Sequence, residues 1–134
     1  AMNITLVNRA ISKVYFKNMT YLSKPNTGIS LESKQETRVE FNFENNRLIC
    51  TISVHMTEEN SEPSLEIDFE IVGFYVCDEP IEEANKNELH VMACQNLYPY
   101  LVEAIASLTS GAGISPIILP PLSMVAGDIT KVDE

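Results

Sequence analysis

Hydrophobic and polar residues alternate with a period of two through the middle of the chain, and this pattern predicts a β-hairpin. The segment TRVEFNFENNRLICTISVHM, residues 37–56, has apolar side chains at every second position on both sides of Asn45–Asn46. Asparagine tolerates the positive φ that a tight turn requires, so the two halves are expected to pair as antiparallel strands. One face of the hairpin is so apolar that other parts of the chain must cover it. Its second strand is expected to point Leu48, Cys50, Ile52, Val54 and Met56 inward.

Two more segments predict strands. Residues 14–22, VYFKNMTYL, are rich in β-branched and aromatic side chains. Residues 63–76, PSLEIDFEIVGFYV, alternate apolar with acidic side chains at first, but Phe74 and Val76 are apolar on the face that begins acidic. A strand that is apolar on both faces needs a cover on both, so a second subunit or a bound partner is expected there. Between the first two strands, residues 23–36 are expected to form a long loop, and such loops are often functional.

The last third of the chain predicts a helix. Residues 89–94 are expected to form a short helical piece, and Asn96 is expected to cap the main helix. Pro99 is tolerated because it then falls in the first turn. Gly111 and Gly113 supply the stop. The predicted fold class is therefore α+β: a four-stranded antiparallel sheet with a long C-terminal helix packed on one face.

The surface of this helix carries almost no charge. Glu103 is the only ionised side chain between Glu88 and Asp128. One face is apolar, and Ala106 and Ser107 leave the opposite side small, which permits close approach of another helix. The apolar face comprises Leu97, Leu101, Ala104, Ile105 and Leu108.

Length and composition indicate a single domain over residues 1–134, with an N-terminal arm at 1–10 and a short tail at 125–134. The chain is 45% apolar and has a net charge of −10, from 19 acidic and 9 basic residues. So acidic a chain is a poor partner for nucleic acid or an anionic membrane. No apolar run reaches the ~18 residues of a transmembrane helix, and no signal peptide is recognisable. Three unevenly spaced cysteines fit reduced thiols in the cytoplasm.

Catalytic and metal-binding signals are sparse. His90 and Cys94 are four residues apart and could share a helical face, which is the geometry of an activated thiol. Because no acid partner or oxyanion donor accompanies them, we expect a buried, inert Cys94 and a solvated His90. Two histidines and scattered cysteines give no metal-ligand spacing, so neither a metal nor a cofactor is expected. The chain is predicted not to be an enzyme.

Two motifs resemble the SecB family of cytoplasmic export chaperones. VYFKNMTYLSKPN, from residue 14, is similar to that family's first strand and its Pro-Asn exit. ACQNLYPYLVEAIASLTSGAGISPIILPPLSM, residues 93–124, is similar to its signature helix and apolar proline loop. The resemblance covers roughly residues 11–124 and implies a SecB-like fold.

The resemblance also implies a homotetramer, a dimer of dimers in which the long helices lie between sheets. The interface would then include Leu97, Leu101, Ala104, Ala106 and Leu108. Family members hold unfolded polypeptides in apolar grooves beside the sheet and the proline loop. Carried onto this sequence, the client groove would involve Ile29, Leu31, Phe74, Tyr75, Ile117, Leu119, Leu122 and Met124.

Docking to the translocase motor SecA is expected to be weakened. The acidic positions that the family uses for it fall on Asn18 and Leu22, and only Asp68 keeps its acid. The leading hypothesis is an ATP-independent holdase for unfolded preproteins or other non-native polypeptides, acting in protein export or in protecting an antitoxin. The alternatives are a small-molecule carrier and a structural oligomer that use the gap between sheet and helix.

Overall fold

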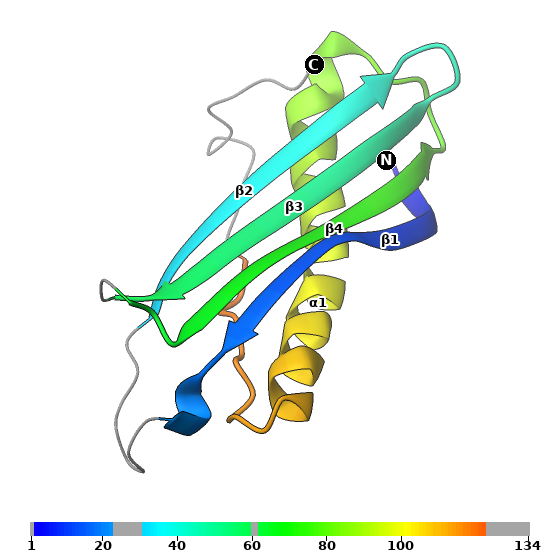
Figure 1. The fold of residues 1–134 in the computed structure, drawn as a ribbon. Helices are drawn as coiled ribbons and strands as arrows, with labels where there is room; N and C mark the ends of the chain where they lie inside the picture. The colour runs from blue at the N-terminus through cyan, green and yellow to red at the C-terminus, as the bar shows by residue number, and fades with distance from the viewer. Residues whose placement is uncertain (1, 23–30, 60–61, 123–134) are drawn as a thin grey trace.

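The computed structural model describes residues 2–22, 31–59 and 62–122. Four strands form one antiparallel sheet in the order β1-β4-β3-β2, so β1 and β2 are the edge strands. A single long helix crosses one face of the sheet (Figure 1). This arrangement confirms the predicted α+β fold. The elements are β1 (Ile4–Asn18), β2 (Leu31–Asn42), β3 (Arg47–Glu58), β4 (Leu65–Cys77) and α1 (Lys86–Gly111), with 3-10 turns at Thr20–Leu22 and Glu83–Asn85.

The β2–β3 hairpin forms where the alternating pattern predicts it. Asn42 pairs with Arg47 across the turn, and Asn46 has the positive φ of 56° that the turn requires. The five inward residues of β3 are each at most 2% exposed, because α1 covers this face of the sheet. We call it the inner face and the opposite one the outer face.

Both edge strands are longer than the sequence predicts. β1 begins at Ile4, so most of the expected N-terminal arm is strand, and residues 20–22 form a 3-10 turn instead of strand. β2 begins at Leu31, inside the expected loop, whose residues 23–30 lie outside the described part of the chain. The early part of β2 is polar and exposed. Main-chain pairing with β3 holds it in place, and that pairing leaves no hydrophobic pattern in the sequence.

The helix is continuous where two pieces are predicted. Asn96 lies inside α1 and does not cap it, and Pro99 sits in the helix interior. Proline there lacks the N–H for the carbonyl four residues earlier, a loss of ~3 kcal/mol or more. Burial on both sides of this point offsets the loss, because Leu89, Cys94 and Leu101 are each completely buried. The helix ends at Gly111, and Gly113 has a φ of 86°, as predicted for the stop.

Gly73 allows close contact between the sheet and the helix. A Cβ atom at this position in β4 would lie 2.9 Å from Leu97 Cδ1 and 2.8 Å from Tyr75 Cε1, closer than real Cβ contacts come. Leu97 therefore packs directly against the β4 backbone. The fully buried core lies along this line, between α1 and the two central strands.

Candidate functional site

The segment after α1 is fastened to the helix by two side chains. The Thr109 hydroxyl accepts a hydrogen bond from the backbone N–H of Ile117 (2.9 Å) and donates one to the carbonyl of Ile105 (2.9 Å). The Tyr98 hydroxyl donates to the carbonyl of Pro120 (2.6 Å) and accepts from Gln35 Nε2 on β2 (3.3 Å). Both anchors are buried, since Thr109 is 0% and Tyr98 is 5% exposed. They hold residues 113–122, which we call the proline segment, beside α1.

A predominantly apolar pocket of about 490 Å³ lies between α1 and the proline segment. Its walls are hydrocarbon except for the polar side chains of Gln95 and Glu103 at the helix. An apolar concave surface with few polar groups suits hydrophobic side chains of a partner. The apolar residues that line it are Tyr98, Pro99, Val102, Leu119, Pro120, Pro121 and Leu122.

A second hollow, of about 580 Å³, lies between β1 and the other side of α1. Arg9 spans it, with its guanidinium carbon 4.0 Å from the centre of the Tyr100 ring, a cation–π contact. Ala104 lines the same hollow. Along β1, Ile11 and Val14 remain 53% and 50% exposed, because α1 does not reach across this edge strand. The strand therefore presents apolar side chains without a cover from the described chain, whereas the hollow itself is lined by both polar and apolar residues.

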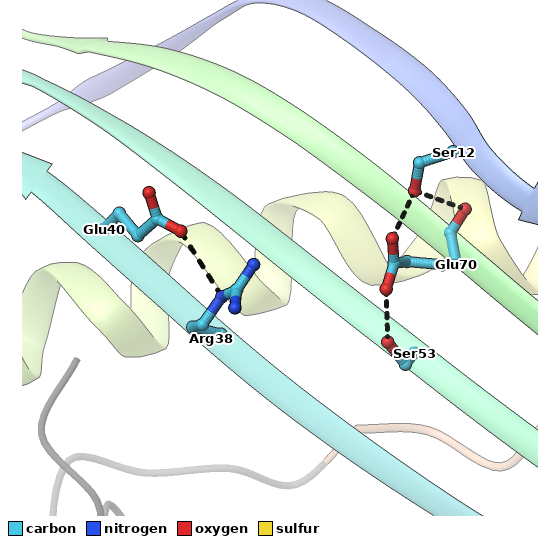
Figure 2. Close-up of polar contacts among 5 residues, drawn as sticks. All are labelled: Ser12, Arg38, Glu40, Ser53 and Glu70. Carbon is cyan, nitrogen blue, oxygen red and sulfur yellow. Dashed lines mark hydrogen bonds and ion pairs between the residues drawn. The ribbon is translucent and has the colours of Figure 1, made fainter. Parts of the chain in front are cut away.

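The outer face is polar along its middle (Figure 2). Glu70 accepts hydrogen bonds from the hydroxyl of Ser12 on β1 (2.6 Å) and from that of Ser53 on β3 (3.0 Å). The bond from Ser12, the bond from Ser53 and nearby positive charge lower the pKa of the Glu70 carboxyl, although partial burial opposes this. On β2, Arg38 and Glu40 form an exposed ion pair (3.4 Å).

Asp68, the residue expected to dock a motor protein, already has a partner on the outer face. Its carboxylate is hydrogen-bonded to Nδ1 of His55 on the neighbouring strand β3. The Asp68 side chain is 30% exposed, so part of the carboxylate still reaches solvent. Leu22, at an acidic position of the resembled family, is 69% exposed.

The residues predicted for the client groove fall into separate places. Leu119 and Leu122 line the apolar pocket, and Ile117 precedes them on the same segment. Phe74 lies on the outer face, where it lines a different pocket of about 410 Å³. Leu31 begins β2, half-buried against the core. Ile29 and Met124 lie outside the described residues.

Tyr75 lines the same pocket as Phe74 but is almost completely buried. It is 1% exposed on the inner face, and its hydroxyl donates to Oδ1 of Asn96 in α1 (2.8 Å). Burial raises the pKa of the Tyr75 hydroxyl. Its neighbour Phe74 is turned to the opposite face, because side chains alternate along a strand. Tyr75 therefore holds the helix to the sheet.

The residues predicted for the oligomer interface divide into a group that is completely buried and a group that remains accessible. Leu97 and Leu101 are completely buried under the chain's own sheet, so they leave no surface for a second subunit. Ala104, Ala106 and Leu108 are half-buried and remain accessible. Helical periodicity groups the leucines with Ala104, but it does not show which side of the helix the chain covers itself.

His90 is buried, in contrast to the solvated histidine expected. It is 4% exposed, and its Nε2 lies 3.2 Å from the hydroxyl of Thr37 on β2. Cys94 is completely buried, as expected. Within residues 2–22, 31–59 and 62–122, no group of three or more His, Cys, Asp or Glu side chains could hold a metal ion. No helix in these same ranges is long and apolar enough to cross a membrane.

Sequence reasoning missed Tyr98 and Thr109 as the anchors of the proline segment. The aromatic-Pro-Tyr step that contains Tyr98 is visible in the sequence, but nothing in the sequence pairs its hydroxyl with Pro120 or Gln35. The one sequence signal for Thr109 is its position four residues after Ile105 on the core-facing side of the helix, where a threonine hydroxyl can bond back to the preceding turn.

Comparison with known proteins identifies relatives of the chain. No family model matches it. It is 30% identical, over 111 residues, to the uncharacterized protein MJ0357 of Methanocaldococcus jannaschii, across 79% of this chain and 70% of the archaeal one. The chain belongs to the family of this archaeal protein.

Solved structures show which fold this chain has. The Rv1957 SecB-like chaperone of Mycobacterium tuberculosis, in complex with a ChAD peptide from the Rv1956 HigA1 antitoxin, superposes with a TM-score of 0.70 at 20% identity. The match covers 89% of this chain and 90% of the chaperone chain. A Streptococcus agalactiae protein of unknown function matches with a TM-score of 0.53 at 10% identity, over 90% and 98% of the two chains. The SecB-like fold implied by the two sequence motifs is thereby confirmed.

Proposed function

We propose that the chain is a molecular chaperone without enzymatic activity, an ATP-independent holdase that binds unfolded polypeptides. The observation that carries this proposal is the apolar pocket between α1 and the proline segment. The SecB-like fold, shared with a chaperone that binds an antitoxin peptide, supports it.

The pocket fits extended polypeptides with apolar side chains. Its lining is hydrocarbon contributed by Tyr98, Val102 and Leu122, so it would take up many apolar side chains without requiring one sequence. The two anchors keep the pocket formed before a client arrives, which reduces the ordering that binding requires. The net charge of −10 would keep a protein with such exposed apolar surface soluble.

The two alternative functions have less support. A carrier would need an enclosed space between sheet and helix, but the completely buried Ile52, Cys94 and Leu101 fill the centre of this layer. The hollow between β1 and α1 is instead lined in part by the charged side chains of Arg9 and Glu103. A purely structural oligomer would have no use for a pocket held open by Tyr98 and Thr109. A holdase accounts both for the filled layer between sheet and helix and for the pocket held open by Tyr98 and Thr109.

We further propose that the working form is a homotetramer, a dimer of dimers, located in the cytoplasm. Ile11 and Val14 on the edge strand β1 are about half exposed, and Ala104 lines the hollow beside them. An edge strand with exposed apolar side chains readily pairs with another chain. On α1, Ala106 and Leu108 would complete the interface.

The clients we propose are preproteins or other non-native polypeptides, in export or in antitoxin protection. Delivery to SecA would be weak, because Leu22 is apolar and Asp68 shares its carboxylate with His55. Fewer free acids leave less attraction for a basic partner. Asp68 is the one position at which we propose residual docking.

The test is an aggregation assay with several unrelated denatured proteins at stoichiometric ratios. The unmodified chain should suppress aggregation without ATP. Leu122→Ser, which alters the pocket lining, should weaken client binding measured by calorimetry by ~2 kcal/mol. Ile118→Ser is the matched control, because Ile118 lies on the same segment, is 67% exposed and does not line the pocket. Equal client affinity in both variants would contradict this site, and absence of any suppression would contradict the holdase itself.

A further inference from the structure

Two thiols meet between the sheet and the helix. Cys50 on β3 and Cys94 on α1 are 44 residues apart in sequence, and their sulfur atoms are 3.8 Å apart. Both residues are completely buried. The third cysteine, Cys77, is buried at the end of β4 and shares no contact with them that would make it part of the pair.

His90 adds an unusual polar group beside this pair. It precedes Cys94 by one helical turn, so the two side chains share a face of α1. Its Nε2 contacts the hydroxyl of Thr37, but its buried Nδ1 has no hydrogen-bond partner. A buried nitrogen without a conventional partner is unfavourable, and the thiol of Cys94 is the group beside it that a histidine can activate.

The environment makes the two thiols unequal. The hydrogen bond from Cys50 and the nearby His90 lower the pKa of Cys94 to about 6, although burial opposes this. The same contact, together with burial, raises the pKa of Cys50. Because His90 lies one helical turn from Cys94, we assign Cys94 as the attacking sulfur and Cys50 as the resolving one. A reactive dithiol needs this division between an attacking thiolate and a resolving thiol.

We propose that Cys50 and Cys94 are an oxidation site for a hydroperoxide, at which a reversible disulfide links β3 to α1. The Cys94 thiolate attacks the terminal peroxide oxygen and the O–O bond breaks, giving a sulfenic acid at Cys94 and hydroxide or alkoxide. The Cys50 sulfur then attacks the sulfenic sulfur, and the S–S bond forms as water leaves. The two protons lost by the thiols end on the two oxygens, so one peroxide oxidises two thiols.

The geometry supports this chemistry. A disulfide has an S–S length of about 2.05 Å, so the sulfurs must approach by roughly 1.8 Å from their 3.8 Å separation. The pair is buried, which favours a small uncharged oxidant over a bulky disulfide such as oxidised glutathione. Thr37, which contacts His90, is half-buried on the edge strand β2. Transient opening of this edge would admit a hydroperoxide.

The bond would clamp the helix to the centre of the sheet. It would close a 44-residue loop, which in the chain-entropy model lowers the unfolding equilibrium constant roughly a thousandfold. This inference does not depend on the proposed chaperone function, because it concerns the core and not the apolar pocket.

The experiment treats the folded protein with hydrogen peroxide, alkylates the remaining thiols and maps peptides by mass spectrometry without reduction. We expect an intramolecular Cys50–Cys94 link that dithiothreitol removes, and an unfolding midpoint in urea that rises with the oxidised fraction. The control Cys77→Ser should form the same link. Cys50→Ala should stop at a sulfenic acid on Cys94, which a dimedone probe traps, and His90→Gln should slow the reaction several-fold.

Peptide mapping of the peroxide-treated, unmodified protein tests the proposed disulfide even if a variant folds poorly. An unreacted pair at peroxide doses that oxidise a free reference thiol would overturn the proposal. So would a link through Cys77, or a Cys50–Cys94 link that forms only in urea.

Discussion

The anchor at Thr109 offers a sharp test of how the proline segment is held. Thr109→Val replaces the hydroxyl with a methyl group of nearly the same size, so no cavity forms at this completely buried position. The Ile117 N–H then loses its acceptor, the Thr109 oxygen at 2.9 Å. The Ile105 carbonyl, which accepts from the hydroxyl, is less affected because it lies inside α1 and keeps its helical hydrogen bond.

The expected effect follows from that one lost acceptor. A net hydrogen bond is worth ~0.5–1.5 kcal/mol, and a buried N–H without a partner costs about 1–3 kcal/mol. Ile117 is half-buried, so water can partly replace the hydroxyl, and we expect a loss of ~1–2 kcal/mol. The same energy should speed hydrogen exchange of the Ile117 amide roughly tenfold, because this amide exchanges when the segment opens locally.

The assay combines urea unfolding with amide hydrogen exchange measured by NMR. Thr109→Ser is the matched control, because it keeps the hydroxyl and removes only a methyl group, so Ile117 should retain its protection. If Thr109→Val leaves both the stability and the exchange of Ile117 unchanged, Thr109 does not anchor the segment. Client binding should fall with the loss of protection, since the anchor shapes one wall of the pocket.

Three further predictions address the other surfaces. Ala106→Arg should split the proposed tetramer into smaller species in light scattering, because a buried unpaired charge costs several kcal/mol, whereas Glu32→Arg on exposed β2 should not. Ser53→Ala removes one of the hydrogen bonds that lower the pKa of Glu70, so NMR of the carboxyl group should show a higher Glu70 pKa in the variant. Ionised Glu70 stabilises the fold slightly at pH values above the pKa that it has in the unfolded chain. As pH falls, the variant should lose this stabilisation at a higher pH than the unmodified protein does. Leu22→Glu should strengthen SecA binding in a salt-sensitive way, and tight binding by the unmodified chain would refute our account of the weakened docking.

The sequence predicts the parts of the fold that are governed by burial. Alternation identified the five inward residues of β3, and the position of Asn46 at the turn follows from its tolerance of positive φ. These features depend on short-range pattern alone. The edge strands were placed less well, because the start of β1 and that of β2 depend on main-chain pairing with β4 and β3.

The candidate site was only partly predictable for the same kind of reason. Leu119 and Leu122 stand out as apolar residues in a proline-rich segment, and they do line the pocket. Tyr75 and Phe74 look alike in sequence, yet the pleat turns one into the core and the other outward. Leu97 and Leu101 look equally suited to a core or to an interface, and only the position of the sheet decides between them.

The apolar pocket draws its described walls from a short stretch of the chain. Among the residues that the structure describes, those that line it lie between Gln95 and Leu122, on α1 or on the segment that follows directly. The described part of the sheet contributes a brace, through the bond from Gln35 to Tyr98. For the proposed holdase, client preference would therefore depend on a stretch outside the strands, although its helix also supplies Leu97 and Leu101 to the core. A descendant of this chain could acquire new clients by substitutions in a single continuous stretch of the gene while the sheet that carries the core stays unchanged.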